Sequence, residues 1–135
     1  MKLHVVAALL LLSACAPGVR VEGEAPVAPR GPVYVLAYMG DALQRPTSLA
    51  LTEFSSMTGV RWTSWGDERA TGTGTLHGTW CRTEAECARG LPATLELSGL
   101  LRLERTGYYS RFTVTTTTPP PGEDLTDGRL EVPPR

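Results

Sequence analysis

The chain has 135 residues with 13 basic and 14 acidic side chains, so its formal net charge at pH 7 is −1. This length accommodates one domain of roughly 100 residues and no second hydrophobic core. The nearly balanced charge excludes the basic stripe of a nucleic-acid-binding protein and a polybasic membrane-binding patch.

The first 14 residues have the pattern of an export signal. A positive start at Lys2 precedes the apolar run Val5–Leu12, which is far shorter than the ~20 residues that a membrane-spanning helix needs. The run ends in Leu12-Ser13-Ala14-Cys15, which resembles the lipobox of bacterial lipoproteins. That resemblance implies a signal peptide over residues 1–14, cleavage before Cys15 and diacylglycerol attached to the Cys15 sulfur. An ordinary cleavable signal followed by an unrelated cysteine is the alternative.

Acylation of Cys15 would determine where the protein resides. Each buried CH₂ group contributes about 0.8 kcal/mol, and one acyl chain binds a bilayer only weakly, so two or more chains make a stable anchor. We therefore expect an extracytoplasmic protein anchored by lipid to a bacterial cell membrane or outer membrane. Signal cleavage removes Lys2 and no acidic residue, which leaves 12 basic and 14 acidic side chains.

A flexible linker is predicted over residues 15–32. Residues 16–32 contain four prolines and three glycines without periodicity, so they cannot bury enough apolar surface to offset their ordering entropy. At ~3.1 Å per residue this linker would reach roughly 50 Å. A first strand around Val19–Val21 is the alternative.

The folded domain is predicted over residues 33–118. Alternating or continuous apolar residues predict strands at Val33–Met39, Pro46–Phe54, Val60–Trp65 and Glu68–Leu76. Gly59 separates the second of these strands from the third. The one helix candidate, Glu84–Arg89, is hardly longer than one turn.

The last two predicted strands form a hairpin around Thr106-Gly107. In Thr94–Glu104, one face carries Leu95, Leu97, Gly99, Leu101 and Leu103, and Gly99 marks a bulge or bend. In Tyr108–Thr118, one face carries Tyr108, Ser110, Phe112 and Val114. The short strands and turns predict an all-β fold, a small antiparallel β-sandwich or barrel of about six to seven strands.

The Pro-rich C-terminal tail, residues 119–135, begins with Pro119-Pro120-Pro121, which stops the last strand. An Asp-Gly turn signal and the apolar pair Leu130 and Val132 follow. The tail therefore either adds one edge strand or stays loose.

The middle of the chain carries three short motifs: Trp62-Thr63-Ser64-Trp65-Gly66, then Ala70–Leu76 with glycines at 72 and 74, then Cys81 and Cys87. This W-x-x-W-G, A-x-G-x-G and Cys-pair pattern resembles small exported β proteins of GC-rich bacteria, many of them actinobacteria. The resemblance covers about residues 46–114 and implies an exported β domain, with no known activity. No phosphate-binding loop is predicted at Ala70–Gly74, because the glycines more plausibly let a backbone or a Trp ring pack closely.

Cys81 and Cys87 are the two thiols that remain once Cys15 carries lipid. Outside the cytoplasm an isolated pair usually forms a disulfide, so a Cys81–Cys87 disulfide is predicted. A metal or redox site is the alternative, but a metal would need further ligands, and His77 is the one histidine after residue 14. We expect no metal and no cofactor.

Trp62, Trp65 and Trp80 are the candidate ligand-binding residues, because exposed aromatic rings form platforms for sugars. Trp62 and Trp65 have opposite parity and cannot share a strand face unless a bulge intervenes. The alternative places one of them in the core and leaves the other partly exposed.

No catalytic set emerges from the remaining polar residues, and we expect no enzyme. His77 reads as a surface strand residue, Ser64 lacks a histidine in a recognisable motif, and the acids Glu68, Glu84 and Glu86 lie in or near turns. A carboxylate pair cannot be argued from sequence.

The sequence thus predicts a membrane-anchored lipoprotein with a non-enzymatic role in the cell envelope, either structural or as a partner of another envelope protein. The alternatives are a small-molecule or glycan-binding module that uses the tryptophans, and an inhibitor of a secreted hydrolase. A binding module should show a concave pocket with convergent polar groups, whereas an interaction protein should show a flat apolar patch. An enzyme should show clustered acids or His77 in a cleft.

Overall fold

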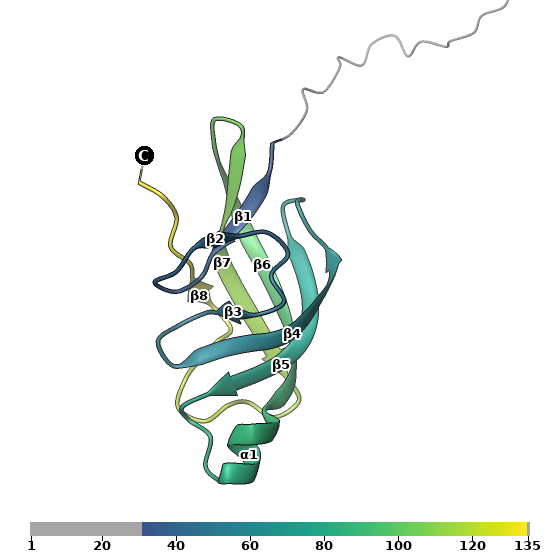
Figure 1. Ribbon diagram of the computed structural model, residues 1–135, viewed down its shortest axis with the longest axis vertical. Coiled ribbons are helices and arrows are strands. Elements are labelled where there is room, and N and C mark those ends of the chain that lie inside the picture. The colour runs from purple at the N-terminus through teal and green to yellow at the C-terminus, as the bar shows by residue number, and fades with distance from the viewer. Residues whose placement is uncertain (1–30, 135) are drawn as a thin grey trace, which may run out of the picture.

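The computed structural model describes residues 31–134; the predicted signal peptide, Cys15 and most of the predicted linker lie outside the described residues. The described part forms a single eight-stranded curled sheet with one short helix at its end (Figure 1). The all-β prediction is therefore confirmed. The elements are β1 (Val33–Leu36), β2 (Ala42–Leu43), β3 (Leu49–Ala50), β4 (Ser55–Ser64), β5 (Ala70–Gly78), α1 (Glu84–Arg89), β6 (Leu91–Leu103), β7 (Thr106–Thr116) and β8 (Gly128–Arg129). This helix is too short to cross a membrane, and residues 31–134 contain no other.

The strand order is β2-β1-β7-β6-β5-β4-β3, and β8 pairs with β7 beside β1. Every pairing is antiparallel except that of β1 with β7, which is parallel. The strands β4 to β7 are long, whereas β2, β3 and β8 have two residues each. Short edge strands leave few unpaired backbone groups for another chain to pair with.

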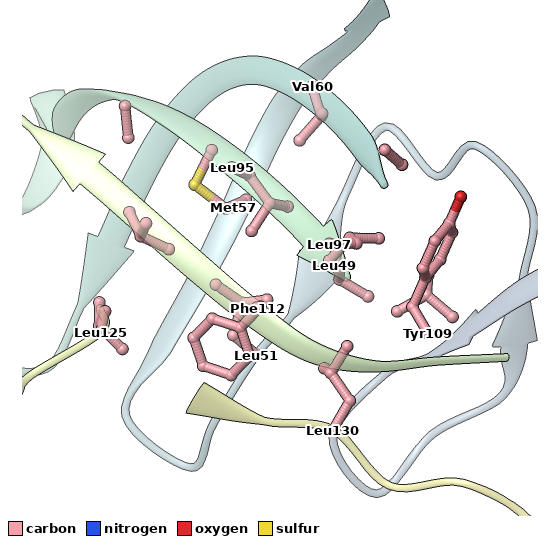
Figure 2. Packing of buried hydrophobic residues seen from close by; sticks show 14 of the residues in the cluster. Leu49, Leu51, Met57, Val60, Leu95, Leu97, Tyr109, Phe112, Leu125 and Leu130 are labelled. Carbon is pink, nitrogen blue, oxygen red and sulfur yellow. The ribbon is translucent and has the colours of Figure 1, made fainter. Parts of the chain in front are cut away.

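The core fills the concave side of the curled sheet (Figure 2). Its largest fully buried side chains include Tyr109, Phe112, Met57 and Leu95. Leucines of the β3 segment and of the C-terminal tail cover this side, so the sheet needs no second sheet to bury its apolar face. The buried apolar cluster comprises Val33, Val35, Leu49, Leu51, Met57, Val60, Ala70, Leu76, Ala93, Leu95, Leu97, Tyr109, Phe112, Val114, Leu125 and Leu130.

The predicted strand Pro46–Phe54 is mostly not a strand. Leu49 and Leu51 are buried as the pattern suggested, but only Leu49–Ala50 pairs, with β4. The Thr52 hydroxyl accepts hydrogen bonds from the backbone N–H groups of Phe54 and Ser55, each at 3.0 Å, and so turns the chain before β4 begins.

The boundary predicted at Gly59 is also wrong, because β4 runs through it. Gly59 has φ +59° and lies where the register of β4 on β5 shifts between Thr58 and Arg61. A glycine that looked like a strand breaker is therefore the irregular position inside a longer strand.

The assignment of residues to the core face of the β6–β7 hairpin is correct before Gly99 in β6 and wrong between Gly99 and the turn. Leu97 and Phe112 are buried opposite each other, but Tyr109 is buried opposite Leu100, which packs against the core. Gly99 has φ +64°, and the register is the same on both sides of it. Both strands therefore rotate there together, and Leu101 and Tyr108 lie on the outer face instead of the core face.

Residues 119–134 pack onto the domain and supply an edge strand, which selects the first of the two predicted alternatives. Leu125 and Leu130 belong to the buried cluster, and Arg129 pairs with Arg111 of β7. The Glu123 carboxylate accepts hydrogen bonds from the hydroxyls of Ser55 (2.5 Å) and Thr52 (2.8 Å). The tail is thus bonded to the β3–β4 turn as well as to β7.

Candidate functional site

The three tryptophans predicted as ligand platforms are half-buried, and each indole N–H has a partner inside the domain. Trp62 Nε1 donates to Pro46 O (2.9 Å), Trp65 Nε1 to Val33 O (3.2 Å) and Trp80 Nε1 to Ser55 Oγ (2.9 Å). All three rings pack against the buried core. The indole hydrogen bonds of the three tryptophans therefore connect loops to the sheet.

The W-x-x-W-G motif builds an aromatic corner around Tyr109. The register of β4 on β5 shifts a second time between Trp62 and Ser64. This is the bulge that Trp62 and Trp65 need in order to lie on the same side of the strand. The Trp62 and Trp65 rings consequently pack edge to face with their centroids 4.8 Å apart, and the Trp65 and Tyr109 rings pack in the same way with centroids 5.4 Å apart. Gly66 has φ +96°, and its N–H donates to the Tyr109 hydroxyl (2.9 Å).

Tyr109 is fully buried, and its hydroxyl donates to Asp67 O at 2.7 Å. Burial raises the pKa of the Tyr109 phenol above its ordinary value of 10.0, and the negative charge of Asp67 acts in the same direction. The hydrogen bond from Gly66 opposes the shift. The neutral Tyr109 hydroxyl thus holds the turn after β4 in place through its hydrogen bonds to Gly66 and Asp67.

The glycines of the A-x-G-x-G motif make room for packing, which confirms that prediction. A Cβ atom on Gly72 would lie 2.8 Å from Val60 Cγ1 and 3.0 Å from the Trp62 ring. One on Gly74 would lie 2.6 Å from Thr58 O. Both approaches are too close for any side chain, so the motif serves close packing of β5 on β4.

The predicted Cys81–Cys87 disulfide is present, with the two Cα atoms 5.2 Å apart. It encloses most of α1, which begins at the N-cap Thr83 and ends at Gly90 with φ +68°. Because α1 buries no residue, the disulfide and the caps hold it in place.

His77 lies beside this disulfide loop, at the end of β5. Its Nε2 is 3.1 Å from Thr58 Oγ1 and its Nδ1 is 3.4 Å from Cys87 O. Both ring nitrogens therefore have a partner within the domain, and His77 bridges β4 and the disulfide loop.

The structure does not bring together the polar residues that were considered for catalysis. Glu68 is exposed in the turn before β5, and Glu84 and Glu86 lie in the first turn of α1. The Ser64 hydroxyl accepts the backbone N–H of Thr71 at 3.0 Å. Between residues 31 and 134, no group of three or more His, Cys, Asp or Glu side chains is arranged to hold a metal ion.

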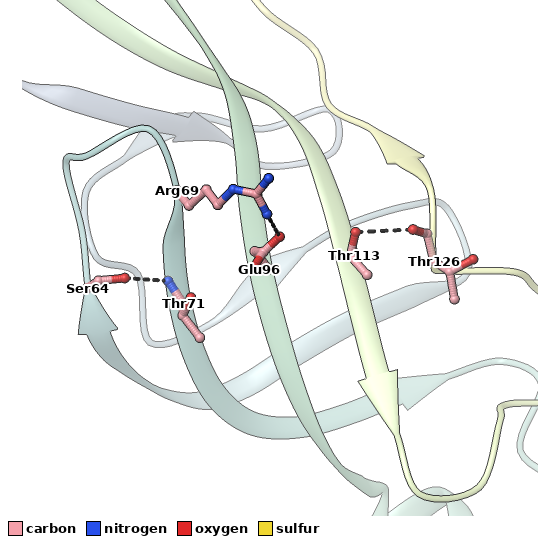
Figure 3. A network of polar contacts seen from close by, with 6 residues as sticks. All are labelled: Ser64, Arg69, Thr71, Glu96, Thr113 and Thr126. Carbon is pink, nitrogen blue, oxygen red and sulfur yellow. Dashed lines mark hydrogen bonds and ion pairs between the residues drawn. The ribbon is translucent and has the colours of Figure 1, made fainter.

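The outer face of the sheet presents polar side chains in rows that cross four adjacent strands. One row runs from Ser64 through Thr71 and Glu96 to Thr113 (Figure 3). The side chains of Ser64, Glu96 and Thr113 have partners within the protein, and Thr71 takes part through its backbone N–H. Glu96 pairs with Arg69 at 2.9 Å, and the Thr113 hydroxyl donates to Thr126 O at 3.1 Å.

The neighbouring row differs because its polar groups point to solvent. Cross-strand pairing places Arg61, Thr73, Thr94 and Thr115 side by side on β4, β5, β6 and β7, and all four are exposed. No side-chain hydrogen bond or ion pair that forms within residues 31–134 uses any of them.

This second row lines an open trough of about 790 Å³. Thr75 and Thr117 extend it toward α1, and glycine and proline backbone completes the wall. The trough is a shallow depression that is open to solvent, so a ligand would lie along it and would not be enclosed. The lining contains one cation, Arg61, and neither an acid nor an aromatic ring. We call this feature the threonine trough.

Sequence reasoning missed the threonine trough because it treated the threonines as strand formers. The available signal was an alternation of threonines, at 71, 73 and 75 in β5 and at 113 and 115 in β7, with Thr117 just after β7. Alternate residues of a strand share a face, so each run predicts a line of hydroxyls. Only the strand order shows that β6 lies between them with Thr94.

Comparisons of the chain with protein-family models, with curated protein sequences and with solved structures find no match. The lipobox-like pattern Leu12–Cys15 and the threonine trough are therefore the observations from which a function can be inferred.

Proposed function

We propose that this chain is a lipid-anchored protein of the bacterial envelope and that its β domain has a non-enzymatic binding role there. Cys15 carries the anchor, and residues 15–32 form the linker. The threonine trough carries the binding part of the proposal, since it is a four-strand row of polar groups without protein partners among the described residues.

The position of the trough supports this role. Where the described chain begins, the N–H of Gly107 donates to Pro32 O at 2.9 Å, beside the tip of the β6–β7 hairpin. The trough includes Pro92 near the start of β6, at the α1 end of the domain (Figure 1). A linker attached at residue 31 would hold the domain by the opposite end, so the trough would face away from the lipid.

Recognition by the trough fits the structure better than recognition by the tryptophan rings does. Their indole N–H groups are engaged inside the domain, whereas the hydroxyls of Thr73, Thr94 and Thr115 are available to a polar ligand. We therefore assign recognition to the trough.

Fractionation of cells expressing Cys15→Ser tests the anchor. The variant should leave the membrane fraction, and the wild-type chain should carry a lipid mass on its N-terminal cysteine. Cys87→Ser is the matched control, because it also replaces one cysteine by serine but should stay with the membrane. Membrane retention of Cys15→Ser would overturn the anchoring.

Co-sedimentation tests the binding role. The mature chain carrying Cys15→Ser, which is soluble under this proposal, should bind purified insoluble envelope material in a saturable manner. Thr94→Val should reduce that binding, because valine keeps the shape of threonine and removes its hydroxyl. Absence of saturable binding would refute a binding role.

A further inference from the structure

We infer that the threonine trough binds an acidic polysaccharide, a chain of sugars that carries carboxylates, with Arg61 pairing with a carboxylate. This inference rests on the proposed function and deepens it by naming the class of ligand.

The hydroxyl row indicates a hydroxyl-rich ligand. A threonine hydroxyl both donates and accepts hydrogen bonds, as does each hydroxyl of a sugar, so the two pair without a fixed polarity. The three strand-to-strand steps from Arg61 to Thr115 cover ~14 Å. That span suits an extended chain lying across the strands better than a single small molecule.

The charge of the trough indicates that the ligand is acidic. Arg61 is exposed at one end of the row and forms no ion pair with any described residue. Glu96 is the acid of the adjacent row, and Arg69 pairs with it at 2.9 Å. An anionic group on the ligand would therefore meet the guanidinium without a competing protein carboxylate, in the bidentate geometry that arginine offers.

A carboxylate fits this arrangement better than a phosphate does. Phosphate sites gather several cations or backbone N–H groups around one anion, whereas the trough provides one cation and several hydroxyls. One carboxylate accompanied by many neutral hydroxyls is the composition of a sugar-acid polymer. The absence of an aromatic ring from the trough lining further indicates recognition by hydrogen bonds instead of ring stacking.

The test compares polygalacturonate with its carboxyl-reduced form, which keeps the chain and converts each carboxylate to a neutral CH₂OH group. Isothermal titration calorimetry on the mature Cys15→Ser chain should show saturable binding of polygalacturonate and at least tenfold weaker binding of the reduced polymer. Binding should weaken as NaCl is raised from about 0.05 M to about 0.5 M. Equal binding of both polymers, or binding of neither, would overturn the acidic-ligand assignment.

Single substitutions locate the site. Arg61→Ala should weaken polygalacturonate binding about tenfold, and Thr94→Val about threefold. Thr113→Val is the matched control, because its hydroxyl belongs to the other row and already donates to Thr126 O. A loss with Thr113→Val equal to that with Thr94→Val, or no loss with Arg61→Ala, would refute the site.

Two measurements separate failure to fold from failure to bind and distinguish the two proposals. Arg61→Ala and Thr94→Val should unfold in urea at the wild-type midpoint, and Arg61→Gln replaces Arg61→Ala if that variant unfolds at lower urea. Thr113→Val, which loses its bond to Thr126 O, need only remain folded in the binding buffer. One outcome is that the protein fails to bind polygalacturonate and still binds insoluble envelope material, with Thr94→Val weakening the latter. In that case the ligand class is wrong and the binding role stands. If polygalacturonate binds while Cys15→Ser stays on the membrane, the anchoring is wrong and the ligand class stands.

Discussion

Removal of the C-terminal tail tests whether residues 119–134 are part of the folding unit. A chain ending at Thr118 loses Leu125 and Leu130, which are 3% and 9% exposed. Burying one leucine side chain contributes about 1.5–3 kcal/mol, so the pair contributes about 3–6 kcal/mol. The loss of Glu123 also removes the carboxylate that accepts from Ser55 and Thr52, at about 1 kcal/mol.

This loss is large compared with the total stability of such a domain, about 5–15 kcal/mol. At an m-value of about 1.5 kcal/mol/M, a loss of 3 kcal/mol or more lowers the urea midpoint by about 2 M. The assay is equilibrium unfolding of the mature Cys15→Ser chain in urea, followed by tryptophan fluorescence. Trp80 is a local reporter, because it donates to the same Ser55 hydroxyl that Glu123 accepts from.

A chain ending at Val132 is the control, because it keeps Leu125, β8 and Leu130. It should unfold at the midpoint of the full mature chain. A midpoint for the Thr118 truncation within about 0.3 M of the full chain would refute the reasoning. It would mean that the tail is loose and that the two leucines contribute nothing measurable.

Two further predictions concern the aromatic corner and the disulfide. Tyr109→Phe should lower the free energy of unfolding by about 1–3 kcal/mol, because it removes the hydrogen bond to Asp67 O and the one from Gly66 N. Since burial raises the pKa of Tyr109, the unfolded chain ionises this phenol above about pH 10 while the folded chain keeps it neutral. The free energy of unfolding should therefore fall with pH more steeply in wild type than in Tyr109→Phe between about pH 9 and 11; parallel curves would contradict this. Replacing Cys81 and Cys87 by serine should lower the free energy of unfolding by about 2.4 kcal/mol, the chain-entropy value for a loop of about seven residues; urea midpoints unchanged by the double substitution would contradict it.

Local patterns in the sequence were sufficient where the neighbours along the chain determine the structure. The helix Glu84–Arg89 was predicted with its observed bounds. The disulfide followed from having two cysteines in a chain expected to be exported. The close packing at Gly72 followed from a glycine among strand formers with bulky residues nearby. Each of these depends on a few residues close in sequence.

The candidate site was predictable only in part. The tryptophans were recognised as important, yet their indole N–H groups reach Pro46, Val33 and Ser55, which are 15 or more residues away in the chain. No local pattern reveals whether such a distant acceptor is within reach. Exposure and burial of these rings therefore depended on how the loops fold back onto the sheet.

The sequence by itself determined that residues 33–118 contain strands, one short helix and a disulfide, because residue alternation and cysteine spacing act over a few residues. The tertiary structure alone decided that β1 lies parallel to β7, that the core face changes at Gly99, and that Arg61 and three threonines form one row. Cross-strand neighbours are set by strand order and register, which depend on contacts between residues far apart in the chain. A trough built from four strands is for that reason a property of the sheet and cannot be read from any one strand.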